Sequence, residues 1–172
     1  MILIHHSNIH HSFMDYKHFL YEEFPVLLRG LKTDTPSQWG KMNAQQMIEH
    51  LILVVSASNG RITIQPIADD DRLAYRKMRF FEKDTPMPRS LRVDFVPEEP
   101  RALQCANIEE AKMELFNQLQ RFDDYFNEHE GITTVHPVFG AFNFDEWIQN
   151  HARHFRHHLM QFGLIQEVPT EN

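Results

Sequence analysis

Several histidines near position 150 have the spacing of metal ligands. Of the 12 histidines in the chain, four lie close together in sequence, at His151, His154, His157 and His158. The surrounding stretch is predicted to be helical, and His154 and His158 are four residues apart, so their imidazoles leave the same side of the helix. Two such nitrogens, with a third from elsewhere in the chain, form a common site for a divalent metal ion.

The third nitrogen is expected from His50. This residue lies among apolar side chains in the stretch from 42 to 51, which is also predicted to be helical. Helix bundles build metal sites from side chains on facing helices. A single buried histidine is more often a core residue that is hydrogen-bonded to protein groups. The prediction of a metal site therefore depends on His154, His158 and His50 together. We predict that His50, His154 and His158 bind one divalent metal ion and leave coordination positions open.

Three further side chains are alternative ligands or supports behind the ligands. His151 lies at the centre of the helix arc that should face the core, whereas His154 lies at its edge. His151 is therefore an alternative to His154, although it is about 10 Å from His158 along the helix axis. His157 is expected to support the ligands or to lie at the surface. Glu49 is the nearest carboxylate, but it points about 100° away from the histidine that follows it.

The elements that must position these side chains are four amphipathic helices. Apolar residues recur at helical spacing, and the predicted helix starts are marked by residues that cap helix N-termini. The predicted helices cover residues 13–31, 44–58, 108–129 and 144–162. Pro25 is expected to kink or split the first helix. Capping boxes are predicted for the other three helices, and they pair Asn43 with Gln46, Asn107 with Glu110, and Asn143 with Glu146.

Four such helices predict an all-α fold, a four-helix bundle in a single domain of residues 1–172. Residues 61–106 contain five prolines and are expected to form an irregular excursion over the bundle, with a short helix near 70–81. Residues 1–11 are expected to be a flexible N-terminal tail with incidental histidines. Trp147 and Phe162 fall on the buried arc of the last helix and are predicted to be core residues.

The composition and the lengths of the apolar runs argue against several classes of protein. The formal net charge is -7, with 24 acidic and 17 basic residues, which argues against binding nucleic acid. No run of eighteen apolar residues occurs, so no membrane span is expected. The single cysteine, Cys105, permits no disulfide within the chain and no cysteine-based zinc site, and it is expected to be a small buried residue. A cytoplasmic location is the default expectation.

Two motifs resemble the DinB/YfiT-like metalloenzyme superfamily, and more closely an uncharacterised branch of it. The early motif runs from Trp39-Gly40-Lys41-Met42 to His50. The late motif starts with His136-Pro137-Val-Phe139-Gly140 and continues through His154, His157 and His158 to Gln161-Phe162-Gly163. The resemblance covers the second predicted helix and the last part of the chain well, and the middle only by pattern.

The resemblance implies an up-down-down-up four-helix bundle that holds a divalent metal, often zinc or nickel. Position by position, the ligands implied are His50, His154 and His158. Characterised relatives include S-transferases that use a low-molecular-weight thiol and metal-dependent hydrolases of small molecules, and dimers are common. Better-known members have Arg-Gly-Gln where this chain has Leu159-Met160-Gln161, which leaves the substrate open.

Two functions from different classes follow. Three neutral imidazoles leave most of the charge on a divalent ion, which then acidifies a water or thiol in an open position. Thiolates bind such metals well, so we expect a metal-dependent enzyme with small-molecule substrates, and thiol transfer ahead of hydrolysis. The alternative is a non-catalytic bundle that a metal stabilises, with a stress-related or binding role. Neither nucleic acid nor a membrane is an expected partner, and the resemblance implies a homodimer.

Overall fold

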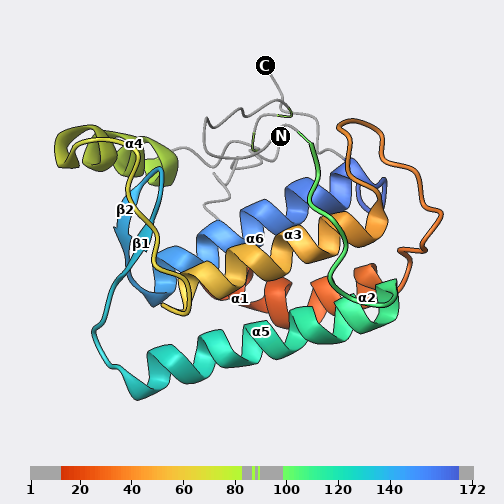
Figure 1. Cartoon of the computed structure of the whole chain (residues 1–172). Coiled ribbons are helices and arrows are strands. Elements are labelled where there is room, and N and C mark those ends of the chain that lie inside the picture. Colours follow the sequence, from red (N-terminus) through yellow and green to blue (C-terminus); the bar gives the residue numbers. More distant parts are fainter. Residues whose placement is uncertain (1–12, 83–86, 88, 90–98, 167–172) are drawn as a thin grey trace, which may run out of the picture.

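The computed structural model describes residues 13–82, 87, 89 and 99–166. The predicted N-terminal tail, residues 1–11, lies outside the described residues. Within the described part of the chain, four helical segments lie lengthwise against one another, and a fifth helix and a small sheet lie at one end (Figure 1). The predicted mainly helical fold is therefore confirmed at the level of secondary structure.

The first helical segment is interrupted as the sequence predicts. It consists of α1 (Phe13–His18), the π-helix η1 (Phe19–Glu23) and α2 (Phe24–Leu28). Pro25 has no N–H to donate to the carbonyl four residues earlier, and the widened π turn lies directly before it. The segment ends at Leu28 rather than at residue 31, and Leu31 follows a turn but stays fully buried.

Helices α3 (Ala44–Ser58) and α5 (Ile108–Glu128) begin at asparagine caps. Asn43 and Gln46 form the predicted capping box, in which each side chain accepts a hydrogen bond from the other residue's backbone N–H. At α5 only half of the predicted box forms. The Asn107 side chain accepts from the Glu110 N–H at 2.9 Å, whereas the Glu110 carboxylate accepts from the Ala106 N–H at 2.7 Å.

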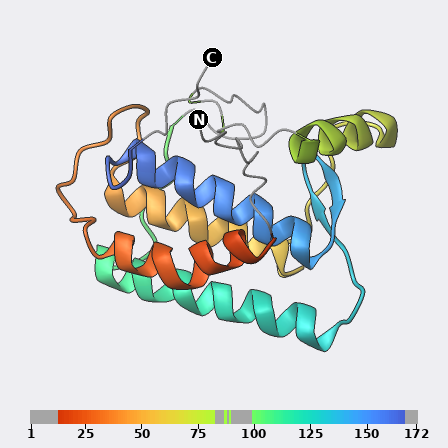
Figure 2. The same ribbon diagram turned by 180° about the vertical axis from the view of Figure 1, so that it is seen from behind.

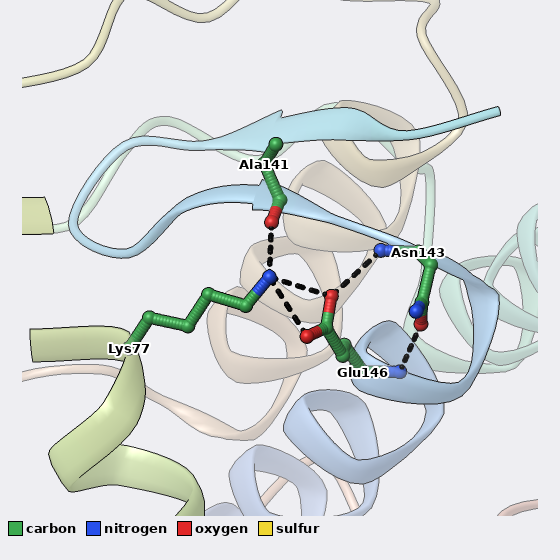
Figure 3. Close-up of polar contacts among 4 residues, drawn as sticks. All are labelled: Lys77, Ala141, Asn143 and Glu146. Carbon is green, nitrogen blue, oxygen red and sulfur yellow. Dashed lines mark hydrogen bonds and ion pairs between the residues drawn. The ribbon is translucent and has the colours of Figure 1, made fainter. Parts of the chain in front are cut away.

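Helix α6 (Phe144–Gln161) begins at the predicted Asn143–Glu146 capping box. Helix α4 (Asp70–Glu82) confirms the short helix expected near 70–81. The Glu146 carboxylate joins these two helices, because it accepts from the Asn143 N–H and also binds the Lys77 ammonium at 2.7 Å (Figure 3). Lys77 donates a further hydrogen bond of 2.6 Å to the carbonyl of Ala141. One charged pair therefore holds α4 against the start of the helix that carries the histidines.

The expectation of an all-α fold is wrong between α5 and α6, where the chain forms a β-hairpin with residues 137–139 as its turn. Strands β1 (Thr134–His136) and β2 (Gly140–Phe142) are antiparallel, with Val135 opposite Ala141. Strands of three residues are too short to give a clear alternating pattern, so their pairing depends on the turn and on packing. The hairpin packs against α4 and the start of α6.

The direction of each helical segment can be followed in both views. Helices α3 and α5 run in one direction, and the α1–η1–α2 segment and α6 run in the other (Figures 1 and 2). Helix α3 packs along α5, and α6 packs on the first segment and on α3. The interior is rich in aromatic rings. Its largest fully buried side chains include Trp147, Phe19, Phe24, Phe122, Phe142 and Phe155.

The predicted buried face of α6 is confirmed. Trp147 is 1 % exposed and Phe162 is 3 % exposed, and His151, at the centre of the predicted arc, is fully buried. Ile148, Phe155 and His158 of the same helix are also buried. Among the described residues, no helix is both long and apolar enough to cross a membrane.

Candidate metal centre

Helix α6 brings His154 and His158 to one side, as their spacing requires. The pair lies one turn apart in the second half of the helix, and the two ring centroids are 4.7 Å apart. His158 is buried, whereas His154 is half-buried. Phe155 and Leu159, which follow each histidine directly, are fully buried and hold this face of the helix against the core.

Helix α3 supplies the third histidine. His50 lies between Met47 and Leu51, both fully buried, and is itself half-buried. Its ring stands edge-on to the other two histidine rings, with centroid distances of 5.0 Å to His154 and 5.0 Å to His158. The prediction that these three histidines meet is confirmed.

The Nε2 atoms of the three rings converge. His154 Nε2 lies 3.2 Å from His50 Nε2 and 2.9 Å from His158 Nε2. One ligand atom from each residue lies within 4.8 Å of the others. Metal–nitrogen bonds of about 2.0–2.1 Å place two ligand nitrogens about 2.8–3.0 Å apart at a right angle and about 3.3–3.4 Å apart at a tetrahedral angle. The two shortest distances fall in this range, so the cluster can hold a metal ion.

Hydrogen bonding alone accounts poorly for these contacts. The Nε2 atom of His154 takes part in both, and a ring nitrogen is either a donor or an acceptor in a given tautomer. A single His154 proton directed at one neighbour leaves no directed hydrogen bond to the other. A cation at the centre would instead use the lone pairs of all three nitrogens at once, which is the chemistry of a three-histidine metal site.

The electrostatic surroundings keep the three imidazoles neutral. Burial, together with the neighbouring His157 and Arg101, lowers the pKa of His50 to about 4. Burial also lowers the pKa of His154 and of His158 well below the ordinary value, and the other histidines of the cluster add to the effect. Neutral rings keep the lone pairs that a metal ion needs, so protons do not compete for the site near neutral pH.

His151, the alternative to His154, lies outside the cluster. It is fully buried, stacks on Trp147 with ring centroids 5.3 Å apart, and its Nε2 lies 2.9 Å from Ser58 Oγ. The Ser58 hydroxyl donates to the Val55 carbonyl at 2.7 Å, so the His151 ring must donate to that hydroxyl. This direction and full burial exclude Ser58 as a nucleophile activated by His151. The tertiary structure therefore places His154, and not His151, in the cluster.

His157 lies beside the cluster rather than in it. Its ring meets the His158 ring edge to face at 5.1 Å and the Trp39 ring at 5.8 Å, and its Nδ1 is 3.2 Å from the Met87 carbonyl. Burial lowers its pKa, which the Met87 carbonyl partly opposes. This position fits the expected supporting role, because the ring packs behind His158.

Glu49 uses its carboxylate elsewhere. The two oxygens accept hydrogen bonds from the backbone N–H of Gln104 at 2.7 Å and of Cys105 at 3.0 Å, and a third comes from the Gln45 side chain at 3.0 Å. Glu49 thus fastens the segment before α5 to α3. Among the described residues, the side chains whose ligand atoms lie close enough together to share one metal ion are the three histidines, and Glu49 is not one of them.

Cys105 is partly buried, where the sequence predicted full burial. Burial raises the pKa of its thiol, and the nearby carboxylates of Glu49, Glu110 and Glu114 raise it further. A thiol with a raised pKa is a poor nucleophile, so Cys105 is not a catalytic candidate.

Sequence reasoning missed the role of Gln161. Its side-chain oxygen lies 2.7 Å from His158 Nδ1, and its side-chain nitrogen donates to the Trp39 carbonyl at 2.8 Å. The sequence does contain a signal for this role: Gln161 follows His158 by three residues, and that spacing places the two side chains on the same side of a helix.

Comparisons of this chain with protein-family models, with curated proteins and with solved structures found no match.

Proposed function

We propose that this chain is a divalent-metal-dependent enzyme of the DinB/YfiT-like type that acts on small molecules. The observation that carries the proposal is the convergence of three Nε2 atoms, with His154 Nε2 at 3.2 Å from His50 Nε2 and at 2.9 Å from His158 Nε2. Sites of this kind, with three protein ligands, are typical of catalytic rather than structural zinc.

Two features of the fold support the family part of the proposal. The helix directions agree with an up-down-down-up arrangement (Figure 2). The two motifs that carry the resemblance also lie together in space, since Gln161 of the late motif bonds to Trp39 of the early one and His158 packs against His50. Residues that are far apart in sequence and share one site are expected if the motifs have a common function.

An open coordination position is what separates an enzyme from a structural site. Among the described residues, no further histidine, cysteine or carboxylate joins the three histidines. His151 and Glu49, two of the alternative ligands expected from the sequence, both have other partners. His50 and His154 also keep part of their surface exposed, which favours access for a substrate.

The reaction we propose is thiol transfer, with hydrolysis as the second choice. A divalent ion, zinc or nickel, would supply Lewis acidity and lower the pKa of a coordinated thiol or water. The chain's own contribution is a set of neutral, well-fixed nitrogen donors that leaves the charge of the ion nearly intact. A low-molecular-weight thiol is the proposed cosubstrate, because thiolates are good ligands for these metals.

The test has two stages. Protein purified without a histidine tag is analysed for bound metal, and the zinc-loaded and nickel-loaded forms are then assayed against a panel of small thiols with electrophilic acceptors and against small esters and amides. We expect one metal ion per chain and turnover that a chelator removes. The matched control is the His129→Ala variant, which changes an exposed histidine on the C-terminal side of α5.

One observation favours a second candidate, a non-catalytic bundle stabilised by a metal. The carboxylate nearest to the cluster in sequence, Glu49, is occupied by backbone N–H groups, so it is not available as a proton acceptor. Stoichiometric metal that raises the melting temperature, together with no turnover on either panel and a spectroscopically closed four-coordinate site, would establish this candidate and refute the enzyme.

A further inference from the structure

We propose that Gln161 is a positioning residue that fixes the tautomer of His158, so that the His158 Nε2 lone pair faces the other two histidines. The inference rests on the proposed metal site and adds a residue to it. Gln161 is 3 % exposed, and its side-chain amide bonds to His158 and to the Trp39 carbonyl, so it acts on the cluster through His158.

The argument starts at a backbone carbonyl. The Trp39 carbonyl can only accept a hydrogen bond, so the nitrogen of the Gln161 amide must face it, at 2.8 Å. The amide oxygen of Gln161 then faces His158 Nδ1, at 2.7 Å. An amide oxygen can only accept, so His158 Nδ1 carries the proton. In a neutral ring this leaves Nε2 without a proton and with its lone pair free.

The loop around Trp39 is built to hold this amide in place. Gly40 has φ +81, and a Cβ atom there would lie 2.7 Å from the Gln161 side-chain nitrogen. A side chain at position 40 would therefore push the amide away from the Trp39 carbonyl. The Gln38 N–H also donates to the Gln161 carbonyl at 2.7 Å. The absence of a side chain at position 40 thus serves the contact between the loop and the end of α6.

Support of this kind changes metal binding in a measurable way. Hydrogen bonds behind a histidine ligand fix its orientation and raise its basicity, and their loss typically costs about 10–100-fold in metal affinity. Without an acceptor at Nδ1, a neutral imidazole places its proton on Nε2, which blocks the lone pair. Removing the Gln161 amide should therefore weaken the metal site even though no ligand has changed.

The first measurement uses the metal-free protein. Nitrogen-15 NMR of the histidine rings should show His158 with a protonated Nδ1 and an unprotonated Nε2. The Gln161→Met variant, similar in volume but without an acceptor, should shift the proton to Nε2. The Gln161→Glu variant keeps an acceptor and should preserve the wild-type tautomer. A wild-type His158 protonated at Nε2, or a tautomer unaffected by Gln161→Met, would overturn the inference.

The second measurement is zinc affinity by competition with a chelating dye. We expect Gln161→Met to bind about 10–100-fold more weakly and Gln161→Glu to recover most of the loss. Gly40→Ala should weaken binding in the same direction. Gly131→Ala is its matched control, because Gly131 has a similar φ of +77 but nothing lies within 4 Å of its added Cβ.

The two experiments separate this inference from the proposed function. If the wild-type protein binds no metal, the proposed function fails, and the tautomer of His158 still decides the role of Gln161. If the wild-type protein binds zinc and the Gln161→Met and Gly40→Ala variants bind it equally well, the positioning role is refuted while the metal site stands.

Discussion

The Nε2 atoms of His50 and His154 lie 3.2 Å apart, although 104 positions separate the two residues in the chain. The contact exists because α3 and α6 pack side by side and each turns a histidine toward the other. Neither helix alone can bring three nitrogens together, so the site depends on the tertiary fold.

Replacing His158 by Ala should abolish stoichiometric metal binding. The variant removes one of three converging nitrogens and leaves two, which bind a divalent ion much more weakly. The measurement is elemental analysis after dialysis against dilute zinc, with His129→Ala as the control. Full occupancy in the His158→Ala variant would show that this histidine is not a ligand.

The stability of the metal-free protein should fall with acidification below pH 6.5. Burial lowers the pKa of His136 and of His151 to about 3, from an ordinary value of 6.5. Between these values the unfolded chain binds protons that the folded chain does not, so the free energy of unfolding decreases as the pH falls through this window. Above pH 6.5 both states are neutral at these residues, and they add no pH dependence.

Each such histidine contributes a slope of up to about 1.4 kcal/mol per pH unit. Urea unfolding of wild type and His151→Leu, both with a chelator present, gives the slope of the free energy of unfolding from pH 7 to pH 4. We expect a smaller slope in the variant, whatever its absolute stability. Equal slopes would mean that His151 is not kept neutral in the folded state.

Trp147→Ala should lower the free energy of unfolding by about 3–5 kcal/mol, the usual cost of truncating a large buried aromatic. The Trp147 side chain is 1 % exposed and its Nε1 donates to Thr134 Oγ1 at 2.8 Å. Phe116→Ala, at a ring that is 37 % exposed, is the comparison and should cost less. A loss of under about 1 kcal/mol in Trp147→Ala would contradict the buried face of α6.

Lys77→Met should destabilise the protein by about 1 kcal/mol, because its ion pair with Glu146 is partly buried (Figure 3). The two side chains are 29 % and 24 % exposed. Arg72→Met is the control, since Arg72 of α4 pairs with Asp69, the residue just before that helix, and the two side chains are 75 % and 64 % exposed. Chemical denaturation gives the free energy of unfolding of both variants. An equal loss in the two variants would show that the ion pair between α4 and α6 stabilises the protein no more than an exposed pair does.

Glu49→Ala should reduce stability by about 1–3 kcal/mol and leave zinc affinity unchanged. The change removes the acceptor for the backbone N–H groups of Gln104 and Cys105 and leaves them without this partner. Urea unfolding and zinc competition are measured on the same preparation. A large loss of zinc affinity with normal stability would instead place Glu49 at the metal centre.

The sequence by itself determined the helices and the pairing of His154 with His158. Helix α3 begins and ends at the predicted residues, and the Asn43 and Asn143 capping boxes form as expected. These features depend on hydrogen bonds and side-chain periodicity within a few residues. Local interactions of this kind are visible in the order of the amino acids.

The tertiary structure decided which of the inward histidines is in the cluster. On a helical wheel His151 is more central than His154, but Ser58 of α3 lies opposite His151, whereas His50 lies opposite His154. The lateral position of α3 against α6 sets these partners, and it results from packing between segments far apart in the chain. The periodicity of one helix contains no information about it.

The same reason explains the anchoring of Glu49 and the contact between Gln161 and Trp39. Each joins residues far apart in the chain, and the two residues of the second contact are 122 positions apart in sequence. Which donor meets which acceptor over such a separation is fixed only when the helices pack, because the geometry of a hydrogen bond depends on positions in space. The sequence therefore determined the candidate ligands, and the tertiary structure decided how they are held.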